Sequence, residues 1–123
     1  MTATTMHGTS VFVVERDGAP LGREQDAVEL IGAIWEQRTE MFAIPAERLP
    51  AEFFDLSTGL AGAFLQKLVG YRQRVAIIGD ISVHTARSSA LTSLVYESNR
   101  GRDVWFLADF AELDERLKRE KAR

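Results

Sequence analysis

The chain has 123 residues, of which 46% are hydrophobic and 27% are charged, and it contains no cysteine. This length and composition predict one soluble globular domain with a hydrophobic core of its own. The lack of cysteine excludes disulfides, cysteine nucleophiles and cysteine-ligated zinc, and two histidines alone do not make a typical structural metal site. We therefore expect neither a metal nor another cofactor.

The charge and the hydropathy pattern restrict the classes of partner. A formal net charge of −3 disfavours a nucleic-acid binder, which usually presents a basic face to the phosphates. No apolar run approaches the ~20 residues of a membrane span, and the N-terminus lacks the basic start and apolar core of a signal peptide. We expect a cytoplasmic protein without a nucleic-acid or membrane partner, in which residues 1–9 are a flexible leader and residues 10–121 form a single α/β domain.

The first half of the domain is predicted to begin with two strands. A run of β-branched and aromatic residues at 11–14 predicts a strand, and Arg16-Asp17-Gly18 signals a turn into a short second strand at 19–22. Apolar residues at three- and four-residue steps then predict an amphipathic helix at about 25–37, with Trp35 on its core face. A short apolar strand follows at 41–44.

The second half alternates helices with apolar strands. The predicted elements are a helix at 60–69, a strand at 75–78, a helix at 87–99, a strand at 104–107 and a last helix capped by Asp109. The strand at 75–78 is apolar on both faces, which is typical of a central parallel strand, and Gly101 suits a left-handed helix end. The order β-β-α-β-α-β-α-β-α predicts an α/β fold with a mixed, mainly parallel sheet and helices packed on it.

The first candidate site is the start of the helix at 60–69. Asp55, Ser57 and Thr58 precede that helix, with Gly59 next to them, and their oxygens can accept hydrogen bonds from its free N–H groups. The same position favours an anion or a phosphoryl group. Phosphorylation there would add about −1.5 to −2 charge beside an aspartate and could release a bound protein. The alternative is that these residues only cap the helix.

The second candidate site is the edge of the sheet where the parallel strands end, because ligands of open α/β sheets usually bind there. The polar residues that follow the predicted strands are Glu52 and Asp55, then Asp80, His84 and Arg87, then Asp109. His84 could act as a general base or a pH switch, oriented by an aspartate and paired with Ser57. No Gly-x-Ser-x-Gly, phosphate-loop or dinucleotide motif supports such chemistry, and a surface histidine before a helix is the alternative.

The third candidate is the corner formed by Glu97, Asn99 and Arg100. A helix end accounts for Asn99 and for the following glycine. It requires neither Glu97 nor Arg100, which leaves an ion pair or a partner-binding corner open.

Several motifs occur together and in order along the chain. They are Phe53-Phe54-Asp55-Leu56, Thr58-Gly59-Leu60-Ala61-Gly62, Gln66-Lys67, Tyr71-Arg72, Ala76-Ile77-Ile78-Gly79-Asp80 and Glu97-Ser98-Asn99-Arg100-Gly101. With these motifs the chain resembles the bacterial family catalogued as domain of unknown function 4180, over roughly Ser10 to Leu117. That resemblance implies a family and no established activity.

A more distant similarity concerns the topology and the start of the second helix, which look like those of STAS domains, the sulfate-transporter and anti-sigma-factor-antagonist fold. In the partner-switching antagonists a serine or threonine at that helix start is phosphorylated by a kinase that is also the binding partner. The corresponding residues here are Ser57 and Thr58, followed by Gly59 and Leu60, with Leu56 inserted after Asp55.

Taken together, these features predict a STAS-like, non-catalytic regulatory or protein-interaction module with a kinase-like or sigma-regulatory partner, switched by phosphorylation at the second helix. The alternative is a small-molecule-binding protein or enzyme that uses the cluster at the strand ends. A homo-oligomerising domain is a third possibility.

Overall fold

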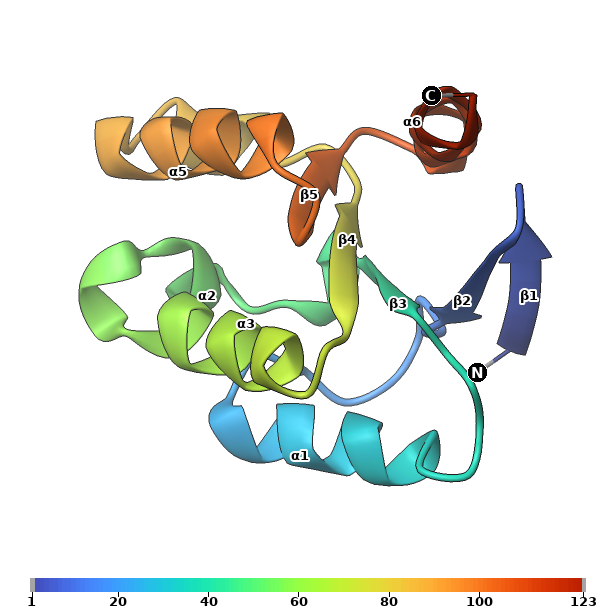
Figure 1. Ribbon diagram of the computed structural model, residues 1–123. Helices are drawn as coiled ribbons and strands as arrows, with labels where there is room; N and C mark the ends of the chain where they lie inside the picture. Colours follow the sequence, from blue (N-terminus) through green and yellow to red (C-terminus); the bar gives the residue numbers. More distant parts are fainter. Residues whose placement is uncertain (1, 123) are drawn as a thin grey trace.

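Five strands form a single sheet in the computed structural model, which describes residues 2–122 (Figure 1). The strands are β1 (Thr2–Met6), β2 (Thr9–Val13), β3 (Met41–Pro45), β4 (Arg74–Ile78) and β5 (Val104–Leu107). They lie side by side in chain order; β1 is antiparallel to β2, and the remaining neighbours are parallel. The prediction of a mixed, mainly parallel sheet is therefore confirmed.

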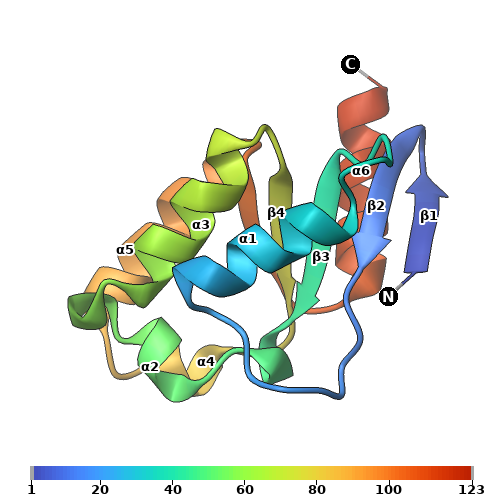
Figure 2. The ribbon, with the colours of Figure 1, turned by 90° about the horizontal axis from the view of Figure 1, so that it is seen from below.

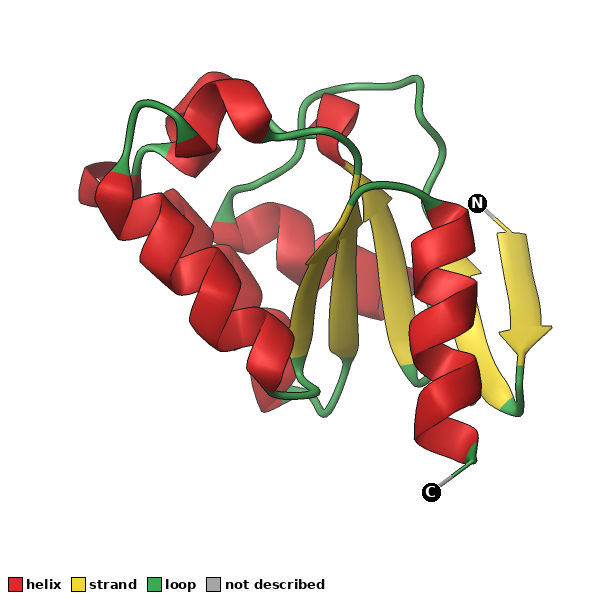
Figure 3. Cartoon of the chain, turned by 90° about the horizontal axis from the view of Figure 1, so that it is seen from above, coloured by secondary structure: helices red, strands yellow, loops and turns green. Residues whose placement is uncertain are grey.

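Helices cover both faces of this sheet. They are α1 (Glu24–Ala33), α2 (Ala51–Phe54), α3 (Leu60–Gly70), α4 (Ser82–Thr85), α5 (Ser89–Arg100) and α6 (Phe110–Lys121), with 3₁₀ turns η1 (Ala46–Arg48) and η2 (Leu56–Thr58). Each crossover from β2 to β5 moves one strand along in the same direction, so right-handed connections place α1, α3 and α5 on one face. Among the helices of residues 2–122, α6, after the last strand, is the one that packs on the other face (Figures 2 and 3).

The central strands contribute to two separate cores because successive side chains point to opposite faces. In β4, Val75 and Ile77 pack under α1, α3 and α5, whereas Ala76 and Ile78 pack under α6. This two-sided burial explains the continuous apolar run in the sequence. It also means that residues following each strand end lie at one common edge between two helical layers.

The segment at residues 1–9, expected to be a leader, contains the first strand of the sheet in its described part, and Met1 lies outside the described residues. Thr2–Met6 pairs in full register with β2, from Thr2 opposite Val13 to Met6 opposite Thr9. His7 and Gly8 both have positive φ, 50° and 84°, as a tight two-residue hairpin turn requires. The segment was missed because β1 is a mostly exposed edge strand with a polar sequence.

The first hairpin therefore lies one segment earlier than expected, and no strand forms at 19–22. The Arg16-Asp17-Gly18 turn signal belongs instead to an irregular connection held by Arg48. That guanidinium donates to the carbonyl oxygens of Glu15 at 2.8 Å, Asp17 at 3.3 Å and Ala19 at 2.9 Å. A long-range cation organises this loop, and local turn chemistry cannot reveal it.

The later elements agree with the prediction apart from their ends. The strands at 75–78 and 104–107 and the last helix are confirmed, but α1 ends at Ala33, and Trp35, expected in the core, is 73% exposed. The helix expected from residue 87 begins at Ser89 after the separate turn α4. Gly101 has φ −92°, so the left-handed helix end is wrong. Side chains donate hydrogen bonds to the backbone carbonyl oxygens at the end of α5 instead.

Candidate functional site

A cleft of about 640 Å³ opens at the carboxyl ends of β3, β4 and β5. After β4 the chain turns to the face covered by α4 and α5, and after β5 it turns to the opposite face and α6 (Figure 1). Neighbouring connections that diverge in this way leave a crevice between them, which is where open α/β sheets usually bind ligands. The cleft is thus a consequence of the topology.

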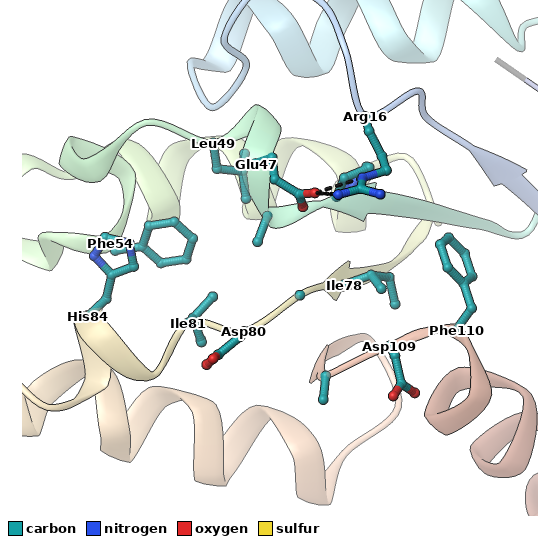
Figure 4. Close-up of a pocket in the computed structure, with 14 residues that line it drawn as sticks. Arg16, Glu47, Leu49, Phe54, Ile78, Asp80, Ile81, His84, Asp109 and Phe110 are labelled. Atoms are coloured by element: carbon teal, nitrogen blue, oxygen red, sulfur yellow. Dashed lines mark hydrogen bonds and ion pairs between the residues drawn. The ribbon is translucent and has the colours of Figure 1, made fainter.

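The cleft combines apolar walls with a polar rim. Figure 4 shows Glu47 and Arg16 on one side, facing Asp80 and Asp109 across the opening, with His84 and Phe110 at the two ends. Leu49, Phe54, Ile78 and Ile81 supply apolar surface. This mixture of apolar lining and a few converging polar groups is typical of small-molecule sites.

Gly79 shapes the floor of the cleft. Its φ of +145° is one that other residues rarely adopt, and a Cβ there would lie 2.9 Å from the Cβ of Ala46. Glycine therefore allows the end of β4 to pass closely beside η1.

Fixed hydrogen bonds hold the rim carboxylates. The pKa of Glu47 is lowered by its own backbone N–H and by the guanidinium of Arg16. That guanidinium lies 2.7 Å from the Glu47 carboxylate. The backbone N–H of Ser82 donates to Asp80 at 2.9 Å, and the Ser82 hydrogen bonds lower the pKa of Asp80. Both groups are ionised at neutral pH.

Asp109 completes the rim as the N-cap of α6, where it accepts a hydrogen bond from the N–H of Glu112 at 2.9 Å. Its predicted capping role is confirmed. Three rim carboxylates, those of Glu47, Asp80 and Asp109, face the single guanidinium of Arg16. The rim therefore carries an excess of negative charge.

His84 lies flat on Phe54, with ring centroids 4.3 Å apart and an angle of 10° between the planes. Among the described residues no hydrogen bond joins His84 to Asp55, Asp80 or Ser57, the groups expected to orient it or to act with it. The triad-like arrangement is therefore not assembled. The stack fixes the ring as part of the wall between two hollows.

The predicted strand-end cluster is divided by this stack. Asp80 lies in the cleft, whereas Glu52, Asp55 and Arg87 line an adjacent hollow of about 530 Å³, and His84 borders both. The cleft also contains Arg16, Glu47 and Phe110, which the sequence did not lead us to expect there. Glu47 follows a strand as Asp80 does, so the same strand-end rule could have found it; Arg16 carries no comparable local signal.

At the start of α3, Asp55 accepts hydrogen bonds from the Ser57 backbone N–H at 3.1 Å and from the Ser57 hydroxyl at 2.7 Å. Thr58 is bonded more fully: its hydroxyl lies 2.9 Å and 2.8 Å from the carbonyl oxygens of Glu52 and Asp55, and it accepts from the N–H of Leu60. Asp55 thus caps η2, and α3 is entered through Gly59 at φ 76°.

The inserted Leu56 has a structural role. It is half-buried and packs against the core on the α3 face. Its side chain anchors η2 and leaves the neighbouring Ser57 exposed.

The corner formed by Glu97, Asn99 and Arg100 lies at the opposite, amino edge of the sheet. Glu97 and Arg100 form an exposed ion pair of 3.8 Å. The Asn99 side chain accepts from the N–H of Phe106 at 2.7 Å and donates to its carbonyl oxygen at 3.1 Å. Asn99 therefore closes the outer edge of β5, as a neighbouring strand would.

A metal centre and a membrane-spanning helix are two other classes of site. Within residues 2–122, no group of three or more His, Asp or Glu side chains is arranged to hold a metal ion. None of the helices in that range has the length and apolar character needed to cross a lipid bilayer.

Comparison with known proteins identifies the family. No curated protein and no solved structure matches the chain, so the STAS-like resemblance stays a prediction. A family model does match, over residues 6–117, a range that contains the cleft, the start of α3 and the Asn99 corner. The motifs that suggested this family all fall within that match. The chain belongs to the family described as Domain of unknown function (DUF4180).

Proposed function

We propose that this domain binds a small molecule in the cleft at the carboxyl edge, and that the ligand joins an amino group to an apolar body. The observation that carries the proposal is the excess of rim carboxylates around an apolar cleft of about 640 Å³. A cation gains from this field, whereas an anion is repelled by it.

The rim carboxylates retain capacity for a ligand. Asp80 and Asp109 each accept one backbone N–H from the following turn, but a carboxylate offers about four lone-pair sites. An ammonium group carries three donors and can bond the free lone pairs of one of these carboxylates. The apolar part of the ligand would contact Ile78, Ile81 and Phe110.

The proposed activity is binding without catalysis. The ring of His84 is stacked on Phe54, and the predicted partners for acid–base chemistry are bonded elsewhere. In this proposal His84 supplies wall surface.

The test compares two probes with similar aromatic bodies and opposite charges, phenethylamine and 3-phenylpropanoate. Isoleucine methyl groups labelled with ¹³C report the binding site: Ile78 and Ile81 line the cleft, whereas Ile31 and Ile34 are buried near α1. We expect phenethylamine to shift the first pair only. Equal responses to both probes, or no response of Ile81, would refute the proposal.

A charge-removing variant sharpens this test. The side-chain oxygen of asparagine can accept the same backbone N–H, so Asp80→Asn with Asp109→Asn removes both charges and keeps the hydrogen bonds of the two turns. We expect phenethylamine affinity to fall about five- to tenfold, as for the loss of two exposed charges. Asp103→Asn, exposed at the opposite edge of the sheet, is the matched control and should leave the affinity unchanged.

A second candidate, a partner-binding switch at the start of α3, is favoured by the state of Ser57. Its hydroxyl is exposed and bonded only to Asp55 among the described residues, whereas the Thr58 hydroxyl is held by the backbone. Under this proposal a kinase-like or sigma-regulatory protein binds unphosphorylated Ser57. Ser57→Asp should weaken its capture from cell extract and Ser57→Ala should not. Equal capture by both variants would exclude the switch.

A further inference from the structure

A second hollow, of about 610 Å³, lies between the turn that joins α5 to β5 and the second half of α6. Four arginines line it, Arg100, Arg102, Arg116 and Arg119, together with the carboxylate of Glu120. The chain as a whole has a net charge of −3, so this concentration of positive charge is local. The hollow is separate from the proposed small-molecule cleft, because it lies at the other edge of the sheet.

Glu120 does not neutralise these four arginines. A fifth arginine, Arg74 of β4, holds both carboxylate oxygens of Glu120 in a bidentate pair of 2.8 and 2.9 Å. The side chain of Arg74 is 11% exposed. Arg102 lies at 3.9 Å from the same carboxylate, beyond hydrogen-bond distance. The lining of the hollow therefore retains a large excess of positive charge.

Arg116 is held in place without a counterion. Its guanidinium lies 4.3 Å from the centre of the Trp105 ring, and Nη2 donates to the carbonyl oxygen of Asn99 at 2.8 Å. No carboxylate among the described residues lies within ion-pair distance of it. Burial and the neighbouring Arg119 lower the pKa of Arg116, and the nearby carboxylates of Glu112 and Glu120 offset this only in part.

Part of this arrangement has a structural explanation. Carbonyl oxygens in the turn after α5 are satisfied by side-chain donors: Arg116 bonds Asn99, the Trp105 indole bonds Gly101 at 2.9 Å, and Arg74 bonds Arg102 at 2.7 Å. Of the arginines near the hollow, this role uses Arg74 and Arg116.

The other three arginines exceed what the turn requires. The side chains of Arg100, Arg102 and Arg119 are 66, 68 and 64% exposed, and their ion pairs are 3.8, 3.9 and 4.0 Å long. Exposed pairs of this kind contribute about 0–1 kcal/mol. These guanidiniums are free to exchange such contacts for a stronger anion.

We propose that this hollow binds a small phosphorylated molecule through a diphosphate group. Guanidinium groups match phosphate oxygens with paired hydrogen bonds, and several of them around one hollow suit more than one phosphoryl group. Trp105 is 2% exposed and carries two guanidiniums against its ring, so it offers no face for stacking a base. The site recognises the anionic group and not an aromatic body.

The experiment uses inorganic diphosphate as the probe and Trp105 as the reporter. The chain has two tryptophans, and the exposed Trp35 can be replaced by phenylalanine, which leaves Trp105 as the only tryptophan. Fluorescence of this Trp35→Phe protein and calorimetry of the unaltered chain should both show saturable binding. Diphosphate should bind more tightly than monophosphate, and ADP should bind like diphosphate because the base is not recognised.

Two neighbouring positions on α6 provide a matched comparison. Arg119→Gln removes a lining charge and should weaken diphosphate binding about five- to tenfold, since charge-assisted hydrogen bonds are lost. Lys118→Gln removes the same charge from a residue outside the lining and should change the affinity less than about twofold. Arg102→Gln, on the turn, should weaken binding as Arg119→Gln does.

Three results would overturn the proposal. The first is no saturable signal with diphosphate at millimolar concentration. The second is equal weakening by Arg119→Gln and Lys118→Gln, which would indicate a general charge effect. The third is tighter binding of a single-stranded oligonucleotide than of diphosphate, which would indicate a nucleic-acid surface.

Discussion

Replacement of Asn99 by alanine should destabilise the domain at the outer edge of β5. The side chain makes hydrogen bonds of 2.7 and 3.1 Å to the N–H and C=O of Phe106. Each is worth about 0.5–1.5 kcal/mol net, and the variant also leaves both backbone groups without their partner, so we expect a loss of about 2–4 kcal/mol. For a domain of this size that lowers Tm by roughly 10 °C.

Urea unfolding followed by circular dichroism measures this loss as a lower midpoint with an unchanged slope. Asn99→Asp should also be destabilised, because a carboxylate can accept from the Phe106 N–H but faces its carbonyl oxygen. Ser93→Ala, exposed on the same helix, is the control and should keep the midpoint. A loss below about 0.5 kcal/mol in Asn99→Ala would refute the assigned role.

The same variant exposes an unpaired strand edge. Open edges promote pairing between chains, so Asn99→Ala should associate more strongly than the unaltered chain in sedimentation at rising concentration. Equal sedimentation of the two proteins would show that other features protect β5.

Three further predictions concern the cleft and the sheet interior. Gly79→Ala should lower stability by at least about 2 kcal/mol in thermal unfolding, because alanine is strained at φ +145° and clashes with η1; an unchanged Tm would contradict this. Glu120→Gln should lower the free energy of unfolding by about 2 kcal/mol, since it leaves Arg74 without its bidentate partner. An unchanged midpoint of urea unfolding would show that this ion pair does not stabilise the fold. The lowered pKa of Asp80 implies a contribution to stability that is present above the ordinary aspartate pKa of about 4 and is lost as the pH falls through the pKa of the folded state. When the free energy of unfolding is measured at decreasing pH, Asp80→Asn should therefore lose less stability below pH ~4 than the unaltered chain does. The same loss of stability in both proteins would refute this.

Much of the candidate cleft could be predicted because it follows from the order of the elements. Carboxyl ends of parallel strands share one edge, so Asp80, His84 and Asp109 could be placed together from their positions after strands. Glu47 obeys the same rule and was overlooked. The stack of His84 on Phe54 could not be predicted, because it depends on how α2 and α4 pack at that edge.

The N-terminal strand shows the opposite case. Thr2–Met6 has a polar, mostly exposed sequence, and it is a strand because it pairs with β2 and contacts α6. Local propensity reports how a segment behaves alone, whereas an edge strand is stabilised by a partner. For the same reason, local sequence patterns could not predict the loop at residues 15–19, which is bonded by the distant Arg48.

By itself the sequence determined the central layers of this protein, because two-sided apolar strands and amphipathic helices leave a periodic trace in the chain. It also determined the helix cap at Asp109 and the edge at which the strand-end side chains gather. Only the tertiary structure decided the charge balance of the two hollows. Arg16 pairs with Glu47 on one side of the cleft, and Arg74 of β4 holds Glu120 of α6, which leaves the exposed arginines of the second hollow with only long ion pairs. Such pairings join residues that are distant in the chain, and local patterns carry no information about distances between them.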